Sequence, residues 1–294
     1  MRRCPRCAST NIDPLFHCAA CGFEPVIEQG VPLLAPALAA EVEGFDPAAF
    51  AMLAASEDGH FWFESRNLLI LRALRRWFPG MRRYLEVGCG TGCVLAAVHR
   101  AFPDTHICAS EVLAAGLPFA AARAKGVELL QLDARALPYE EEFDVIGAYD
   151  VLEHIREDDE VLLQFRRALK PGGGVVLCVP QHPSLWSSQD VLAHHQRRYR
   201  RGELEAKLRA AGFSVRYSTS FMTVLLPLLW IARRGKPSAG LPLAQAQSEL
   251  APSPIVNRVL GAMLAVERTL LSLGLRLPAG SSRMIVATVD ETVR

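Results

Sequence analysis

Residues 84–92 read Tyr-Leu-Glu-Val-Gly-Cys-Gly-Thr-Gly, an apolar run that passes into three alternating glycines. Apolar residues then recur with helical spacing over 92–101. Glycines at a strand-to-helix turn permit a tight backbone and let N–H groups approach a ligand closely. Since ligands of open α/β sheets bind outside the carboxyl ends of the strands, this stretch predicts an α/β fold and marks the place of a ligand site.

Strand-like and helix-like patterns alternate on both sides of this turn. This alternation predicts a doubly wound parallel sheet with helices on both faces. The predicted strands are 83–88, 105–110, 127–132, 142–149, 173–179, 213–220 and 283–289, and the predicted helices between them are 92–101, 112–125, 157–169 and 202–211.

Two acidic residues end the second and third predicted strands. Glu111 follows Gly90 by 21 residues (111 − 90), where a carboxylate is placed to accept hydrogen bonds from both hydroxyls of a ribose. Asp133, followed by Ala134, is placed to accept a hydrogen bond from an adenine amino group. Together with the glycine turn, these acids predict an adenosine-containing ligand.

The glycine turn with these acids resembles the class I S-adenosylmethionine (SAM)-dependent methyltransferases. The resemblance implies a seven-stranded Rossmann-like sheet in the order 3-2-1-4-5-7-6, with the last strand antiparallel. It implies SAM as cofactor, held by Glu86, Gly88, Cys89, Gly90, Gly92, Glu111, Asp133, Ala134 and Tyr149. A nicotinamide dehydrogenase is the weaker interpretation, because Cys93 stands where a dinucleotide loop has its third glycine.

The residues after the fourth predicted strand point to the acceptor side. Asp150, Glu153 and His154 resemble a run in ubiquinone-biosynthesis O-methyltransferases that borders the transferred methyl group, and some of those relatives hold a divalent cation there. The favoured interpretation here is that Glu153 and His154 anchor the following helix instead. A hydroxyl acceptor needs a base, for which His195 is the first candidate, followed by His154 and His182; a structural role is an equal alternative for each.

A basic run, Arg197, Arg198, Arg200 and Arg201, precedes the helix predicted at 202–211. We interpret it as a solvated helix entry rather than a phosphate clamp.

Two Cys-x-x-Cys pairs near the N-terminus predict a zinc ribbon. Cys4, Cys7, Cys18 and Cys21 supply four thiolates with ten residues between the pairs, which suits structural zinc, and His17 is an alternative to Cys18. This element also resembles the N-terminal zinc elements of certain ribosomal-RNA base methyltransferases, which implies RNA as an alternative substrate. Cys89, Cys93, Cys108 and Cys178 are expected to be small core residues.

Composition limits the other function classes. The formal net charge of +1 gives no general argument for nucleic-acid binding. No signal peptide is expected, and the apolar run at 221–232 is shorter than the roughly 20 residues of a membrane span. We therefore expect a cytoplasmic protein, with peripheral contact at the inner membrane face as an alternative.

The predicted organisation has five segments. These are a zinc ribbon (1–35), a helical lead-in covering the cofactor site (36–82), the SAM-binding core (83–220), an apolar helical insertion (221–282) and the final strand with its tail (283–294). The insertion contains one amphipathic helix at 255–273. It is interpreted as a lid or homodimer contact in preference to a membrane-surface hairpin.

These observations predict a SAM-dependent methyltransferase that acts on a small or lipid-like acceptor, most plausibly at oxygen. The alternatives are a ribosomal-RNA base methyltransferase guided by the zinc ribbon and a non-catalytic SAM-binding protein.

Overall fold

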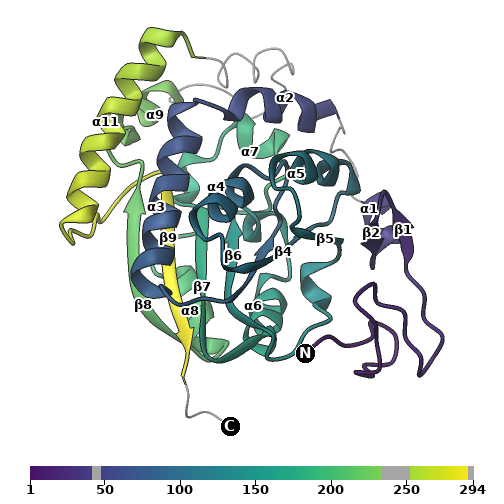
Figure 1. The fold of residues 1–294 in the computed structure, drawn as a ribbon. Coiled ribbons are helices and arrows are strands. Elements are labelled where there is room, and N and C mark those ends of the chain that lie inside the picture. Colours follow the sequence, from purple (N-terminus) through teal and green to yellow (C-terminus); the bar gives the residue numbers. More distant parts are fainter. Residues whose placement is uncertain (42–47, 234–251, 291–294) are drawn as a thin grey trace.

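The protein is described by a computed structural model that covers residues 1–41, 48–233 and 252–290 (Figure 1). The predicted tail after residue 290 and the middle of the predicted insertion lie outside these ranges. Among the described residues, no helix combines the length and the apolar content that a membrane crossing requires.

The centre of the fold is one mixed sheet in the order β1-β2-β5-β4-β3-β6-β7-β9-β8. Strands β3 to β7 pair in parallel, and β9 is antiparallel to both β7 and β8. The core strands are β3 (Arg83–Val87), β4 (His106–Glu111), β5 (Glu128–Gln131), β6 (Phe143–Tyr149), β7 (Leu169–Pro180), β8 (Phe213–Phe221) and β9 (Ser282–Val289). Counted along the chain from β3, their order is 3-2-1-4-5-7-6, so the predicted fold class is confirmed.

The sheet has nine strands rather than seven because residues 26–33 form a hairpin at its edge. Strand β1 (Val26–Glu28) pairs antiparallel with β2 (Val31–Leu33), and Leu33 pairs with Gln131 of β5. The segment assigned from sequence to the zinc ribbon therefore extends the core sheet. The five predicted segment boundaries otherwise stay a prediction.

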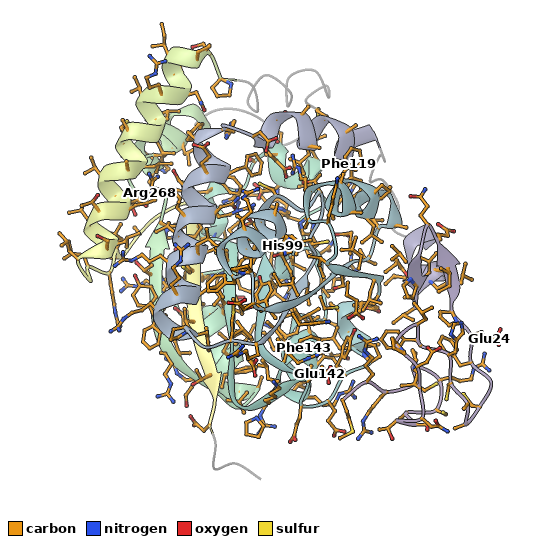
Figure 2. The ribbon with its side chains drawn as sticks, in the orientation of Figure 1. Glu24, His99, Phe119, Glu142, Phe143 and Arg268 are labelled. Carbon is orange, nitrogen blue, oxygen red and sulfur yellow. The ribbon has the colours of Figure 1, made fainter. Side chains whose placement is uncertain are left out.

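Helices cover both faces of the sheet, as the alternating pattern predicts. On one face lie α3 (Phe61–Trp77), α4 (Cys93–Ala101) and α5 (Leu117–Arg123), and the other carries α6 (Asp158–Ala168) and α8 (Glu203–Ala210) (Figure 1). Each face has its own apolar core. Phe143, labelled in Figure 2, is fully buried in the core beneath α6 and α8.

Short elements connect these layers. They are α1 (Pro36–Glu41), α2 (Ala48–Glu57), η1 (Ala114–Gly116), η2 (Ala134–Ala136), η3 (Leu152–His154), η4 (Pro183–Leu185) and α7 (Ser188–Leu192). Two predicted boundaries are wrong. The helix predicted at 112–125 is only the short η1 and α5, and β7 begins at Leu169 rather than 173 because Leu169 pairs with Phe143 of β6.

The predicted insertion contributes α9 (Leu226–Arg233) and α11 (Pro254–Ser272). Helix α11 packs along α3, as Figure 1 shows. Arg268, labelled in Figure 2, donates a hydrogen bond to Ser65 Oγ (2.6 Å), and the Asn257 side chain bonds the start of α3. Buried Glu267 accepts the backbone N–H groups of residues 222, 223 and 224. These contacts hold α11 against α3.

Candidate active site

The glycine turn after β3 has a backbone that only glycine accommodates. Gly88 has φ +70°, and a Cβ there would lie 2.4 Å from Val151 Cγ2. Gly92 has φ +81°, and a Cβ there would lie 2.7 Å from the Ala120 Cα. A side chain at Gly88 would push the turn away from Val151 in the loop after β6, and a side chain at Gly92 would push it away from Ala120 in α5. Cys89 lies between these two glycines with its thiol in the apolar core, where the thiol also donates a long hydrogen bond to the Gly90 carbonyl (4.0 Å).

Glu111 closes the glycine loop from the end of β4. Its Oε2 accepts the Gly90 N–H (2.9 Å) and its Oε1 accepts the Leu113 N–H (3.0 Å). The carboxylate is 8% exposed, and burial raises its pKa above the ordinary value. Glu111 thus lies against the predicted loop, with free lone pairs for further donors.

A buried polar cluster lies at the ends of β3 and β6. The Tyr84 hydroxyl donates to Glu86 Oε2 (3.2 Å) and lies 3.0 Å from the Tyr149 hydroxyl. Desolvation raises the pKa of Glu86 to about 8, against hydrogen bonding from Tyr84 and the charge of Arg66, which lower it. A cation near Glu86 would favour its ionised form.

Asp133 and Ala134 follow β5 at the same edge of the sheet. Asp133 caps η2 by accepting the Arg135 N–H (2.8 Å), and the Arg135 side chain forms an ion pair with its carboxylate (3.0 Å). Ala134 is buried. Asp133 thus lies just after β5 with an arginine beside it that the sequence pattern did not indicate, and its role toward an adenine stays a prediction.

Two clusters in the lead-in were missed from the sequence. Arg66 on α3 is buried, forms an ion pair with Asp150 (2.6 Å) and stacks over Trp62 (4.6 Å). Glu57 of α2 accepts the Thr91 hydroxyl (2.7 and 2.6 Å to its two oxygens) and pairs with Arg123. Arg66 did leave a signal, because it lies three and four residues before Leu69 and Ile70, on the buried face of an amphipathic helix.

The structure brings two of the three candidate histidines together. The rings of His154 and His195 meet edge to face with centroids 4.7 Å apart. His195 Nδ1 lies 2.8 Å from Asp190 Oδ1, and its Nε2 lies 4.0 Å from Glu153 Oε1. His154 is exposed to solvent as a whole residue, but partial desolvation of its ring, and then the charge of His195, lower its pKa.

Asp190 is the missed partner in this cluster. It is fully buried, and it accepts hydrogen bonds from Arg198 Nε (2.7 Å) and the Ser187 N–H (2.8 Å). Bonds from His195 and the charge of Arg198 hold its pKa well below the ordinary value, against desolvation. An ionised carboxylate on Nδ1 would orient the imidazole and leave Nε2 as the reactive nitrogen.

Glu153 does not anchor the helix that follows it. Its side chain is fully buried, and neither carboxylate oxygen accepts a hydrogen bond from the described residues. Desolvation, and then the charge of Asp150, raise its pKa well above the ordinary value. Asp150 is instead paired with Arg66. The group that could hold a cation is therefore Glu153, His154 and His195, whose ligand atoms lie within 4.8 Å of one another.

His182 stays outside this group. It has φ +65°, and its Nε2 is buried without a hydrogen-bond partner among the described residues. Its pKa is lowered by burial and then by Arg283 and Arg198. In the predicted basic run, Arg197 pairs with buried Asp158 and Arg198 with buried Asp190, so these two arginines are neither a solvated helix entry nor a free phosphate clamp.

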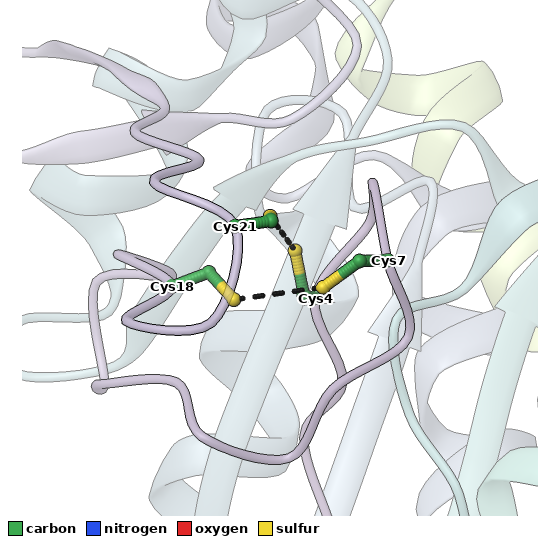
Figure 3. Close-up of side chains that lie close together, drawn as sticks. All are labelled: Cys4, Cys7, Cys18 and Cys21. Carbon is green, nitrogen blue, oxygen red and sulfur yellow. Dashed lines mark hydrogen bonds between the residues drawn. The ribbon is translucent and has the colours of Figure 1, made fainter.

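The four N-terminal cysteines converge in one centre (Figure 3). The Sγ atoms of Cys4 and Cys21 are 3.6 Å apart, and those of Cys7 and Cys18 are 3.7 Å apart. Four sulfurs at about 2.3 Å from a tetrahedral zinc ion are separated by about 3.8 Å, so the centre fits zinc. His17 is turned away to Asp13 (2.7 Å), which makes the alternative ligand set with His17 wrong.

We expect one zinc ion per chain, lost on treatment with a strong chelator at mildly acidic pH. Replacing Cys18, whose side chain is buried, with serine should lower the zinc content to below about a tenth of an equivalent, because a hydroxyl is a poor zinc ligand. Atomic emission spectroscopy measures this, with Cys93→Ser as the matched control. Metal-free purified protein with four titratable N-terminal thiols would contradict the prediction.

Comparisons with known proteins agree with this geometry. The family described as a methyltransferase domain matches residues 54–218, more than half of the 294-residue chain. The ubiquinone biosynthesis O-methyltransferase of Paracidovorax citrulli is 31% identical over 150 residues, which cover 44% of this chain and 60% of that protein. The malonyl-[acyl-carrier protein] O-methyltransferase of Methylococcus capsulatus is 28% identical over 155 residues, covering 49% and 56%. The chain thus spans less than two thirds of these relatives.

A solved structure shows the same fold. Phosphoethanolamine N-methyltransferase 2 of Haemonchus contortus, in complex with SAM, superposes with a TM-score of 0.57 at 17% identity, over 87% of this chain and 60% of that one. The region matched by the family begins within α2 and ends within β8. It therefore includes the glycine turn, Glu111, Asp133 and the histidine cluster. This chain belongs to the methyltransferase-domain family.

Proposed function

We propose that the protein transfers a methyl group from SAM to an oxygen atom of a small or lipid-like acceptor. The observation that carries the proposal is the pair of Asp190 and His195 (2.8 Å), held against the buried Glu153 in loops that follow β6 and β7. The names of two relatives, both O-methyltransferases, support oxygen as the methylated atom.

The cofactor would lie across the carboxyl ends of β3, β4 and β5. In this arrangement Glu111 accepts the ribose hydroxyls, Asp133 accepts the adenine amino group, and the backbone from Gly88 to Gly92 carries the methionine end. The Ala134 backbone would border the adenine, and Tyr149 would border the methionine end. These roles follow from the placement of each residue at one edge of the sheet.

Charge at the methionine end supports the same orientation. The SAM amino group is cationic, and buried Glu86 would become ionised beside it. The SAM carboxylate needs a cation, and Arg66 is a candidate because it pairs with Asp150 and its charge lowers the pKa of Glu86. Because its Nε has no hydrogen-bond partner among the described residues, Arg66 can take an additional acceptor.

Methyl transfer to a hydroxyl is an in-line displacement at the sulfonium, and the hydroxyl must lose its proton. His195 is the candidate general base, because Asp190 occupies Nδ1 and leaves Nε2 to receive the proton. His154 lies against the His195 ring and would position it. A divalent cation on Glu153, His154 and His195 is the alternative way to activate the same hydroxyl.

Incubation with methyl-labelled SAM and fractionated lysate tests the proposal. Label in small metabolites or extractable lipids, released by conditions that cleave methyl esters or ethers, would support it. Label in ribosomal RNA would favour the alternative in which the zinc ribbon guides the enzyme to RNA. Tight SAM binding with no label in any fraction would indicate a non-catalytic protein.

A cytoplasmic location is part of the proposal. All eight cysteines lie within the described residues and none forms a disulfide bond, as expected in a reducing compartment.

The outer face of α11 suggests a partner. Large apolar side chains stand exposed along it, with Ile255 74%, Val259 53%, Val266 61% and Leu273 75% exposed. With Ala262 and Thr269 between them, the spacing is 4-3-4-3-4, which is the period of a helix–helix seam. A membrane-surface helix would carry many basic residues, whereas α11 has only Arg258 and Arg268. We propose that a second copy of the chain covers this stripe.

Replacing Val259 and Val266 together with glutamate should convert a dimer into a monomer, because two charges would then be buried at the seam. Light scattering coupled to size exclusion at about 50 µM measures this. Leu163→Glu, at an exposed apolar position on α6, is the matched control and should stay dimeric. A monomeric wild-type protein, or equal dissociation of the control, would overturn the proposal.

A further inference from the structure

A cavity lies away from the proposed active site, at the far edge of the sheet. It has a volume of about 350 Å³ and lies between α8, the middle of the edge strand β8 and residues 276–278 (elements in Figure 1). Strand β8 is four places from β3 in the sheet order, about 19 Å at 4.8 Å per strand. The cavity is therefore distinct from the glycine turn.

Arginine dominates the lining of this cavity. Its charged residues are Arg201, Arg209, Arg216, Arg276, Arg283 and a single acid, Glu205. We call it the arginine groove. Five cations against one anion stand out in a chain whose formal net charge is only +1.

The single acid in the groove is already neutralised. Glu205 and Arg283 are both buried and form an ion pair at its floor, where Glu205 also accepts the Ser218 hydroxyl (2.6 Å). Arg216 is paired at the rim with Asp290 (3.3 Å). The remaining three arginines, Arg201, Arg209 and Arg276, form no ion pair with any described residue.

Three unpaired guanidinium groups around one concave surface repel one another, and an anion that enters the groove removes that repulsion. One of them is also held in place, because the Arg276 guanidinium lies 5.5 Å from the centre of the Tyr217 ring. Guanidinium groups present paired N–H donors that match phosphate oxygens. The volume is at the small end for ligand sites and suits a compact group rather than a polymer.

We propose that the arginine groove binds a phosphate-bearing ligand, as a phosphate ester or a diphosphate. The lining brings together Arg209 of α8, Arg276 of the segment after α11 and Arg201, so three elements or loops would supply guanidinium groups to the phosphate. The phosphate can come from a free metabolite or from a lipid headgroup. This site is independent of the methyl-transfer function proposed above.

Calorimetric titration of the full chain with pyrophosphate tests the proposal. Saturating S-adenosylhomocysteine is present throughout, so that the glycine turn is blocked. We expect binding by the wild-type protein, and a loss of at least tenfold in affinity in the double variant Arg209→Gln/Arg276→Gln. Thermal melting checks that the double variant is folded. Arg100→Gln replaces an exposed arginine on α4 that forms no ion pair with the described residues; it is the matched control and should bind as the wild type does.

Two vesicle experiments identify the source of the phosphate. Binding to phosphatidylglycerol vesicles, but not to phosphatidylcholine vesicles, and its loss in the double variant would assign a lipid headgroup. Binding of soluble pyrophosphate alone would assign a free phosphate compound. The proposal is overturned if the wild type binds neither pyrophosphate nor anionic vesicles, or if Arg100→Gln weakens binding as much as the double variant does.

Discussion

Replacing Glu111 with glutamine is expected to weaken SAM binding by about 100-fold or more. A hydrogen bond to a charged acceptor contributes about 1.5–3 kcal/mol, and the proposed ribose contact has two of them. The amide of glutamine keeps one neutral acceptor oxygen and replaces the other by an NH₂ donor, so one bond is lost and the other is no longer charge-assisted; together these changes cost about 3 kcal/mol, or a factor of over 100 in the dissociation constant. The substituted amide also turns an NH₂ group toward one of the two backbone donors, Gly90 N–H or Leu113 N–H, which Glu111 now accepts.

Calorimetry with SAM measures this effect, and thermal melting establishes that the variant is folded. Glu160→Gln, at an exposed position in the first turn of α6, is the control and should bind SAM like the wild type. A folded Glu111→Gln protein whose affinity stays within threefold of the wild type would remove Glu111 from the cofactor site and weaken the assignment of β3 to β5 as a SAM edge.

The central fold could be predicted because each of its elements carries a local signal. The strands from β3 to β7 are buried on both faces, so they are apolar runs with polar or glycine residues at their ends. The helices between them are amphipathic. The resemblance carried by the glycine turn, Glu111 and Asp133 then supplied the strand order, including the antiparallel β9.

The β1–β2 hairpin was missed although its turn has a recognisable chemistry. Gln29 and Gly30 both have positive φ, which is the backbone of a tight hairpin turn, but each flanking strand has only three residues. The sequence analysis instead assigned residues 1–35 as a whole to the zinc ribbon. Pairing with β5 at Leu33 and Gln131, nearly 100 residues apart, stabilises the hairpin, and nothing local encodes that contact.

The site was only partly predictable for a similar reason. Residues at the end of a strand or just after it, such as Glu111 and Asp133, are placed by the sheet itself. Asp190 instead lies in α7, a helix of five residues that is too short to show a periodic pattern. Its one local signal is the capping box formed with Ser187 at the start of α7, which indicates a helix start and gives no hint of His195 or Arg198. Asp190, His195 and Glu153 come together only when the chain folds, and no local pattern in the sequence indicates it.

Replacing His195 with alanine is expected to lower the turnover number by a factor of about 10² to 10⁴, with SAM affinity unchanged. The range is that of general acid–base catalysis by a positioned side chain. Asp190→Asn should give part of this loss, because an amide can still orient Nδ1 but no longer stabilises the imidazolium charge. That variant also leaves Arg198 without its buried partner, so its stability must be measured alongside its activity.

Steady-state kinetics with the acceptor found by the labelling experiment separates the roles at this cluster. His182→Ala is the matched control, because His182 is a histidine of the same region that stays outside the cluster, and it should retain turnover. If His195 is a base, chelators leave the wild-type rate unchanged, and raising the pH partly rescues His195→Ala by ionising the acceptor. If Glu153, His154 and His195 hold a cation, EDTA abolishes the rate and Mg²⁺ or Mn²⁺ restores it. A His195→Ala rate within a few-fold of the wild type excludes both roles, because each of them requires the imidazole Nε2 that Asp190 holds toward Glu153.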